Sequence, residues 1–174
     1  MPGDFKENVK VAIIATLASN SALVRATIAS LISAIAEIEI PRGEWGDLIA
    51  SLCMNSSNDQ MQIRMASLQT IGHICEDLLP EDLSNDIKNQ IMLALTNNIS
   101  TDEAFTAPCK LAVRALLHSI PYTSKNFEVP LERDFIMNKI FEALENKDVE
   151  IRENAMQCLV EVGRQEYNYV QHYF

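Results

Sequence analysis

The sequence predicts an all-α superhelical solenoid of about four helix pairs with the start of a fifth. The main observation is a pattern that returns four times, in which aliphatic residues follow a basic residue by seven and ten positions. Its occurrences are Arg25 with Ile32 and Ile35, Arg64 with Ile71 and Ile74, Lys110 with Leu117 and Ile120, and Arg152 with Leu159 and Val162. In addition, Val is sparse beside Leu, Ile and Ala, and five Gly and six Pro are too few for many strands and turns.

The basic residues of this pattern are spaced 39, 46 and 42 residues apart, which is the period of HEAT and armadillo repeats. One helix pair cannot bury its own apolar face, so such an array is stable only as a stack. We therefore interpret residues 1–174 as a single HEAT-repeat array. Its approximate units are 4–40, 41–79, 80–121 and 130–165, and the start of the next unit is 166–174.

Each unit is expected to contain a first helix, A, and a second helix, B, separated by a polar joint. Ser21 is an example of the N-cap signal that opens a B helix. Pro41, Pro80 and Pro121 follow B helices, because proline lacks the N–H that would continue a helix, and Pro108 fits only in an early turn. The expected helices are residues 4–18 and 22–38, 44–54 and 61–78, 83–98 and 104–119, and 131–145 and 150–163, with a polar linker at 122–128.

Composition argues against several classes of protein. A formal charge of −10 disfavours a nucleic-acid partner, because such binding depends on Lys and Arg displacing counterions from phosphates. The sequence has no run of about 18 uncharged apolar residues, so no membrane partner or membrane span is expected. Residues 1–10 lack the pattern of a signal peptide. We expect a soluble protein that is not secreted.

The residues that commonly carry chemistry are dispersed. The four cysteines lie in apolar helical segments without CxxC spacing, so free thiols in a reducing compartment are expected for Cys53, Cys75, Cys109 and Cys158. His73 lies two residues from Cys75, which on a helix points the two side chains about 200° apart and prevents a shared metal. Phosphate-binding loops and nucleophile elbows are absent. No metal, cofactor or enzymatic activity is expected.

Four longer strings carry a more specific signal. They are IPRGEWGDLI at 40–49, IGHICED at 71–77, YTSKNF at 122–127 and ERDFIM at 132–137. With collinear similarity from about Asp4 to Phe174, the sequence resembles the importin-β (karyopherin-β) family of nuclear import receptors. The resemblance implies an internal fragment from the N-terminal half of such a receptor.

The resemblance also implies a function. The intact protein would carry cargo, directly or through importin-α, through nuclear pores by binding the phenylalanine–glycine (FG) repeats of nucleoporins. It would release the cargo when Ran-GTP binds. Such a receptor is found in the cytoplasm, in the nucleus and at the nuclear envelope pore, and it is not an enzyme. The repeats that bind importin-α or cargo would lie beyond Phe174.

The family has an FG pocket between the A helices of adjacent repeats. The matching positions are Met92, Leu93 and Thr96 on one helix and Glu132, Phe135 and Ile136 on the next. Each trio falls on one helical face, and Glu132 with Thr96 would supply a polar edge to apolar walls. The competing interpretation is that the apolar members simply pack between repeats. A second pocket of the family includes Tyr173, which we expect to be exposed because its partners would lie past Phe174.

The resemblance places Ran along the B helices. The acidic candidates at the ends of those helices are Glu37, Glu39, Glu76 and Asp77. The alternative interpretation is that these residues are solvated helix ends. Trp45 is expected at the start of an A helix, either as an apolar plug between repeats or as an anchor for a partner.

Two other functions remain open from the sequence. A HEAT-repeat scaffold of another class, such as a phosphatase regulatory subunit or a vesicle-coat adaptor, would share the period but not the pocket of Met92 and Phe135. An enzyme built on helical repeats would need catalytic side chains that converge in space, and the sequence offers no candidate set.

Overall fold

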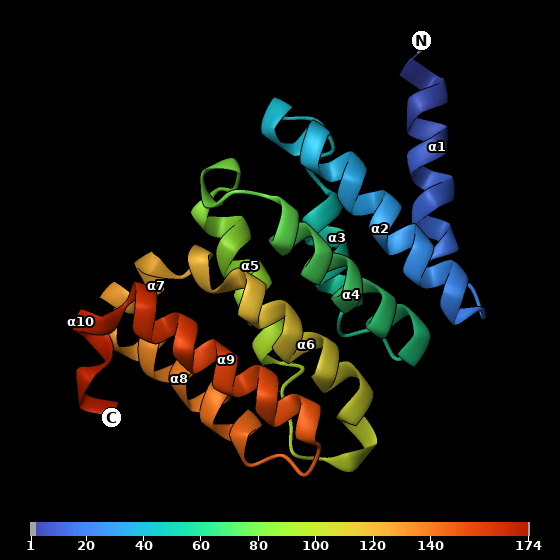
Figure 1. The fold of residues 1–174 in the computed structure, drawn as a ribbon. Coiled ribbons are helices and arrows are strands. Elements are labelled where there is room, and N and C mark those ends of the chain that lie inside the picture. Colours follow the sequence, from blue (N-terminus) through green and yellow to red (C-terminus); the bar gives the residue numbers. More distant parts are fainter. Residues whose placement is uncertain (1–2, 174) are drawn as a thin grey trace.

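The computed structural model describes residues 3–173, which fold into two layers of helices (Figure 1). The A helices are α1 (Gly3–Thr16), α3 (Leu48–Asn55), α5 (Asn85–Thr96) and α8 (Pro130–Leu144). The B helices are α2 (Ala22–Glu39), α4 (Met61–Asp77), α6 (Thr106–Ser119) and α9 (Val149–Gln165). Two short helices, α7 (Ser124–Glu128) and α10 (Tyr167–Val170), and five 3-10 turns complete the chain, and no strand occurs within residues 3–173. The predicted all-α class is confirmed.

The B helices form the continuous layer of the solenoid. Helix α2 packs on α4, α4 on α6 and α6 on α9, and each A helix packs on the B helix of its own unit. Gly72 of α4 lies close to α6, because a Cβ at this position would lie 3.3 Å from the Cβ of Ala115. Close backbone contacts also join α3 to α5, but they are sparse between α1 and α3 and between α5 and α8. The A layer is therefore more open than the B layer.

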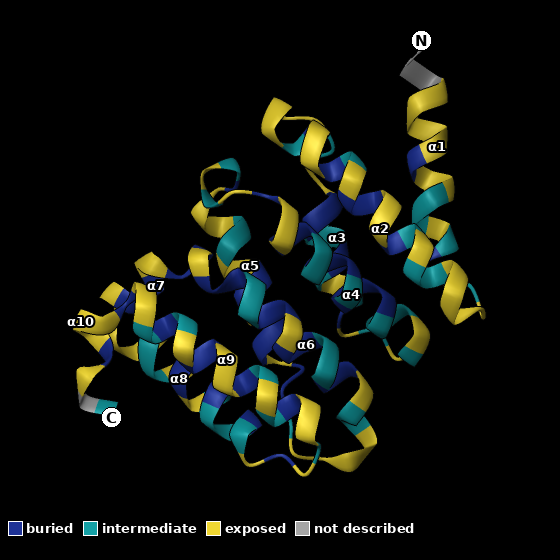
Figure 2. Cartoon of the chain, in the orientation of Figure 1, coloured by how far each residue is buried: buried dark blue, intermediate teal, exposed yellow. Residues whose placement is uncertain are grey.

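The recurring aliphatic pattern identifies the core. Buried residues line the facing sides of the helices, while exposed residues lie on their outer sides (Figure 2). Of the repeated positions, Ile32, Ile71 and Ile120 are fully buried, and so are Ile74 and Val162. Each such side chain contributes about 1.5–3 kcal/mol to folding when it leaves water. The pattern therefore reflects packing between units.

The basic residues that begin the pattern have a structural role. Arg25 donates from Nη1 to the carbonyl oxygen of Ser19 at 2.6 Å. Arg64 donates from Nε to that of Asn58 at 3.1 Å. Arg152 donates from Nη1 to that of Asn146 at 2.8 Å. Each guanidinium thus satisfies a carbonyl in the turn between an A helix and its B helix, where helical hydrogen bonding has ended.

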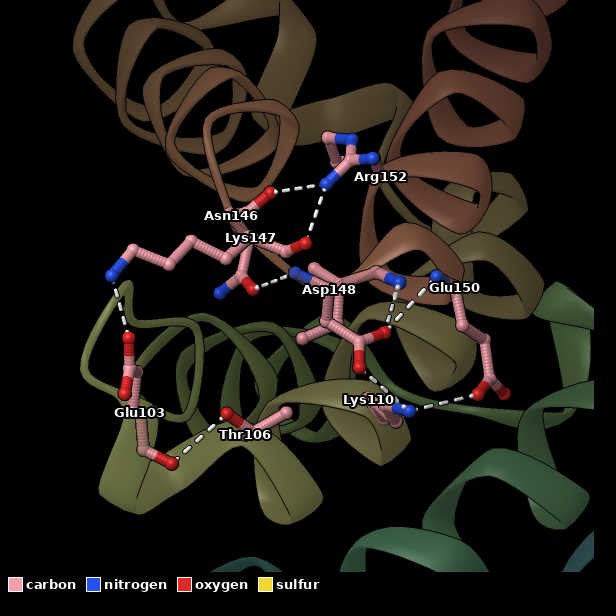
Figure 3. A network of polar contacts seen from close by, with 9 residues as sticks. Glu103, Thr106, Lys110, Asn146, Lys147, Asp148, Glu150 and Arg152 are labelled. Carbon is pink, nitrogen blue, oxygen red and sulfur yellow. Dashed lines mark hydrogen bonds and ion pairs between the residues drawn. The ribbon is translucent and has the colours of Figure 1, made fainter.

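Lys110 is the remaining basic residue of the pattern, and it connects two units instead. Its Nζ lies 2.8 Å from Oδ2 of Asp148 and 3.2 Å from Oε2 of Glu150, at the start of α9 in the next unit (Figure 3). Asp148 also caps α9, because its Oδ1 accepts the backbone N–H groups of Glu150 and Ile151. The Asp148 carboxylate therefore caps α9 and also forms an ion pair with the preceding unit.

Asparagine side chains connect the turns of neighbouring units. Asn98 donates from Nδ2 to the carbonyl oxygen of Ser56 at 3.1 Å, and Asn146 donates to that of Ser100 at 2.9 Å. Oδ1 of Asn146 also accepts the N–H of Asp148 at 2.9 Å. Both asparagines are buried. These bonds span 42 and 46 residues, which is one repeat, so they fix how each unit sits on the one before.

Two segments differ from the sequence-based expectation. Helix α3 begins at Leu48 rather than near residue 44, because Gly43 and Trp45 have positive φ angles of 72° and 57° that a right-handed helix cannot include. The expected linker 122–128 is instead a 3-10 turn followed by α7. This segment packs against the core through the buried side chains of Tyr122 and Phe127. The Tyr122 hydroxyl also donates a hydrogen bond to the Leu78 carbonyl at 2.9 Å.

None of the helices within residues 3–173 combines the length and the apolar character needed to span a membrane.

The asparagine ties can be tested by replacing Asn146 with alanine. We expect Asn146→Ala to lower the free energy of unfolding by about 1–3 kcal/mol, because it removes the buried amide that bonds to the partly buried Ser100 carbonyl and to the N–H of Asp148. Urea unfolding followed by far-ultraviolet circular dichroism measures this change. Asn138→Ala, at an exposed site within α8, is the matched control and should be neutral or slightly stabilising. Equal stability of the two variants would contradict the assigned role.

Candidate functional site

The A layer contains an open groove between α5 and the α7–α8 segment. Its volume is about 340 Å³. It is lined by Asn89, Met92 and Leu93 of α5, Asn126 of α7, and Leu131, Glu132, Phe135 and Ile136 of α8. The structure thus brings together five of the six positions expected for the FG pocket, and Thr96 is not among the lining residues.

The floor and the walls of this groove differ in exposure. Met92 and Ile136 are buried and form part of the hydrophobic core. In contrast, the side chains of Leu93 and Phe135 are 57% and 42% exposed, and Leu131 is 83% exposed. Large apolar side chains that remain accessible beside a buried apolar floor are the features of a site for an apolar ligand group.

One end of the groove is polar. Asn126 is buried and donates from Nδ2 to Oδ1 of Asn89 and to Oε2 of Glu132, each at 2.8 Å. These bonds use both hydrogens of the amide and orient the Glu132 carboxylate toward α7. The polar edge therefore connects α5, α7 and α8, and it holds the two sides of the groove together.

Thr96 lies elsewhere than expected. It is fully buried, and its hydroxyl donates to the Met92 carbonyl one turn earlier at 2.7 Å. This bond satisfies a threonine within a helix, so the side chain offers no polar edge to the groove. Helical spacing from Met92 and Phe135 identifies Asn89 and Leu131, which the sequence interpretation had omitted. Asn126 had no such signal, because its helix was not expected.

The acidic residues expected on the B helices fall into two groups. Glu37, Glu76 and Asp77 are exposed. Asp77 accepts a hydrogen bond from Ser33 Oγ at 2.7 Å, and Oε2 of Glu76 lies 4.0 Å from Nδ1 of His73. These three carboxylates remain accessible at the ends of α2 and α4.

Glu39 belongs to the second group, because it is buried and paired within the molecule. Its Oε1 lies 2.8 Å from Nζ of Lys6, and its Oε2 lies 2.7 Å from Nζ of Lys10. Burial alone would raise the pKa of Glu39, but the hydrogen bonds from Lys10 and Lys6 outweigh burial and hold the pKa below its usual value. Glu39 therefore anchors α1 to α2 and is not accessible to a basic partner.

Comparison with known proteins decides the family. Importin subunit beta-1 of Arabidopsis thaliana is 31% identical over 168 residues, which cover 97% of this chain and 19% of the relative. The Schizosaccharomyces pombe protein of the same name is 33% identical over 163 residues, which cover 93% of this chain and 19% of the relative. The chain is homologous to importin-β. The resemblance inferred from the four sequence strings is thus confirmed, although no protein-family model matches the chain.

Solved importin-β structures share the fold of this homologue. Yeast importin-β (Kap95p) aligns with a TM-score of 0.90, and a Kap95:Nup1 complex with 0.87. A structure in which Kap95p binding induces the switch loops of RanGDP to adopt the GTP-bound conformation aligns with 0.89. Each alignment is 28% identical and covers 99% of this chain and 20% of the other. The predicted HEAT-repeat solenoid is confirmed, and the chain spans about a fifth of the relatives it matches.

In this importin-β homologue, Tyr173 is less exposed than expected. The Tyr173 hydroxyl donates to Oδ1 of Asp134, and its ring centroid lies 6.3 Å from that of Phe141. Arg133 lies over the ring of Tyr169 at 5.8 Å. The segment after α9 folds back onto α8, so residues within the chain supply partners for Tyr173.

The cysteines of the importin-β homologue are unreactive at neutral pH. The four cysteines are free thiols, and burial raises the pKa of Cys53 and of Cys158 to about 12, which keeps both protonated at neutral pH. Among the residues that the structure describes, no group of three or more His, Cys, Asp or Glu side chains is placed to hold a metal ion.

The anchoring role of Glu39 predicts a pH-dependent loss of stability in Glu39→Gln. The folded pKa of Glu39 lies below its ordinary value of 4.5, so its contribution is complete above that pH and is lost as the pH falls through the folded pKa. We expect the variant to be about 1–3 kcal/mol less stable at pH 7, with a difference that shrinks below about pH 4.5.

Urea unfolding of both proteins at pH 7, 5 and 4 measures this difference. Glu37→Gln is the matched control, because Glu37 is an exposed glutamate on the same helix, and it should change stability little at any pH. A deficit in Glu39→Gln that stayed constant across this range would argue against the ion pairs as its cause.

Proposed function

We propose that this chain is part of a non-enzymatic nuclear transport receptor that binds FG-repeat nucleoporins in the groove between α5 and α8. The observation that carries the proposal is this groove, with exposed Leu93 and Phe135 over buried Met92 and Ile136, in a homologue of importin-β. The similar solved structures include a complex of Kap95 with Nup1. Homology also favours a transport receptor over a phosphatase subunit or a vesicle-coat adaptor.

The groove suits weak and rapidly exchanging binding. A phenylalanine ring placed between Leu93 and Phe135 would gain at most about 3 kcal/mol from burial, before the cost of ordering a disordered peptide. The carboxylate of Glu132, held by Asn126 at the polar end, would accept an N–H from the peptide backbone. Several such weak contacts along one FG chain would add up through multivalency.

We further propose that Ran-GTP binds the B-helix layer through the accessible acids Glu37, Glu76 and Asp77. The support is the net charge of −10, the exposure of these carboxylates and the similarity to Kap95p bound to Ran. Cargo or importin-α would bind repeats outside this chain, and the intact protein would occupy the cytoplasm, the nucleus and the nuclear pore. No nucleic-acid partner, membrane partner or cofactor is included in the proposal.

The FG groove is tested with Leu93→Asp. A carboxylate in the apolar wall should weaken binding of an FG-repeat peptide by about tenfold, because the ring would have to desolvate a charge. Leu93 is mostly exposed, so the fold should be unaffected. Chemical-shift titration with the peptide measures the affinity, and circular dichroism confirms the helical content.

Leu23→Asp is the matched control for this experiment. Leu23 is also an exposed leucine, but it lies in the first turn of α2, where an acidic residue is favourable. It should bind the peptide like the wild type. Equal binding by Leu93→Asp and Leu23→Asp would place the FG site outside the groove between α5 and α8.

The Ran surface is tested by reversing one charge with Glu76→Lys. We expect about a tenfold loss of affinity for Ran-GTP at low salt and a smaller loss at high salt, because the contact is exposed and screened. Glu145→Lys, at the exposed C-terminal end of α8, is the control with the same change of net charge. Isothermal titration calorimetry compares the two. An equal loss in both would indicate a general charge effect and refute a contact at Glu76.

A further inference from the structure

A second groove of similar size lies at the other end of the A layer, between α1 and α3. Its volume is about 360 Å³, whereas the groove between α3 and α5 is about 130 Å³. The difference follows from the packing, because close backbone contacts join α3 to α5 but are sparse between α1 and α3. The α1–α3 groove is lined by Glu7, Lys10, Val11, Ile14 and Ala15 of α1, and by Trp45, Asp47, Leu48 and Ser51 in and before α3.

The walls of this groove are apolar and accessible. Val11 is 68% exposed, and Ile14 and Trp45 are half-buried against the core. Leu48 is buried and forms part of the floor. Folding leaves most of the Val11 side chain in contact with water. A ligand that covered this side chain would therefore gain free energy from burying apolar surface.

Trp45 is held at this groove in an unusual way. It is the single non-glycine residue with a positive φ angle among residues 3–173, and bulky side chains seldom adopt φ values near 57°. Lys10 lies 5.1 Å above its ring. Such a backbone conformation persists only where the surroundings enforce it, and it is found preferentially at ligand-binding sites. Packing between repeats, one of the two roles expected for Trp45, accounts for its contact with the core but not for its position on the wall of an open groove.

The charges around the groove favour a cation. Lys10 is buried, and its ammonium group is already paired with Glu39 at 2.7 Å and with Glu7 at 3.3 Å. Lys6 is similarly paired with Glu39 and Glu44. The cluster therefore holds three carboxylates against two ammonium groups, and the exposed Asp47 adds a fourth carboxylate, which makes no side-chain capping bond to α3. This excess of negative charge lies beside an apolar wall.

We propose that the α1–α3 groove binds a short extended peptide that presents one leucine- or phenylalanine-sized side chain next to a lysine or arginine. The apolar side chain would enter between Val11 and Trp45, and the cation would pair with Asp47 and Glu7 at the rim. This site differs from the FG groove because an FG repeat carries no cation, and it does not depend on the proposed nucleoporin binding.

The tryptophan provides a direct readout, because the chain contains only one. A synthetic peptide with the core sequence Gly-Leu-Lys-Gly, titrated into the full chain, should change the emission of Trp45 in a saturable manner. The same peptide with Glu in place of Lys should bind at least about tenfold more weakly, because the charge pairs become repulsive.

Val11→Gln tests whether the peptide occupies this groove. Gln is a better helix former than Val, and the site is exposed, so α1 should remain folded. We expect the affinity for the Leu-Lys peptide to fall about tenfold, because an uncharged amide would replace the apolar wall without adding a carboxylate that attracts the lysine. Val160→Gln, the same change at an exposed valine of α9, is the matched control and should bind like the wild type.

Asp47→Asn tests the electrostatic part separately. Asparagine is also a good N-cap residue, so α3 should be retained, while affinity for the Leu-Lys peptide should fall about threefold at low salt and less at high salt. Leu93→Asp, which alters the FG groove, should leave this affinity unchanged. The two binding proposals therefore fail or succeed independently.

Four results would overturn the proposal. The first is an unchanged Trp45 emission up to millimolar Leu-Lys peptide. The second is wild-type affinity in Val11→Gln, and the third is equal binding of the peptides with Lys and with Glu. The fourth is a shift in emission on raising the protein concentration alone, because a second copy of the chain would then be the occupant.

Discussion

The close packing of successive B helices is the constraint on which the rest of this structure depends. Where α4 meets α6, Gly72 faces Ala115, and a Cβ at residue 72 would lie only 3.3 Å from that of Ala115. Small residues at this contact allow α4 and α6 to approach each other. The turn-to-turn bonds of Asn98 and Asn146 then set the register of each unit on the one before it. The contact between α4 and α6 and these two bonds connect the second, third and fourth units.

The A layer is more open than the B layer. Helices α1 and α3 make few close backbone contacts, as do α5 and α8, and side chains cover these two gaps only in part. The groove between α5 and α8 and the groove between α1 and α3 are similar in volume but differ in chemistry. In the first groove, the polar end is formed by Asn126, which donates hydrogen bonds to Asn89 and Glu132. In the second groove, carboxylates outnumber ammonium groups around Trp45. One architecture thus offers a groove whose single lining carboxylate, Glu132, is held by Asn126, and a groove with an excess of carboxylates.

The acidic residues of the chain have two roles: some pair with lysines inside the fold, and others remain exposed on its surface. Glu39 and Asp148 order helix contacts by pairing with lysines, whereas Glu37 and Glu76 remain accessible on the B helices. Net charge alone therefore overstates the negative surface available to a partner. Exposed carboxylates therefore contribute more to steering a basic partner toward the solenoid than carboxylates that are buried in ion pairs.

The sequence by itself determined the helical class, the period, most helix boundaries and the homology to importin-β, because each depends on local spacing or on strings of adjacent residues. It also identified the groove positions that share a helical face, such as Met92 and Phe135. Tertiary structure alone decided which polar groups face a groove: Thr96 bonds to its own helix, and Asn126 reaches the groove through α7. Such outcomes depend on which partner a buried polar group finds in space, and spacing along the chain does not encode that choice.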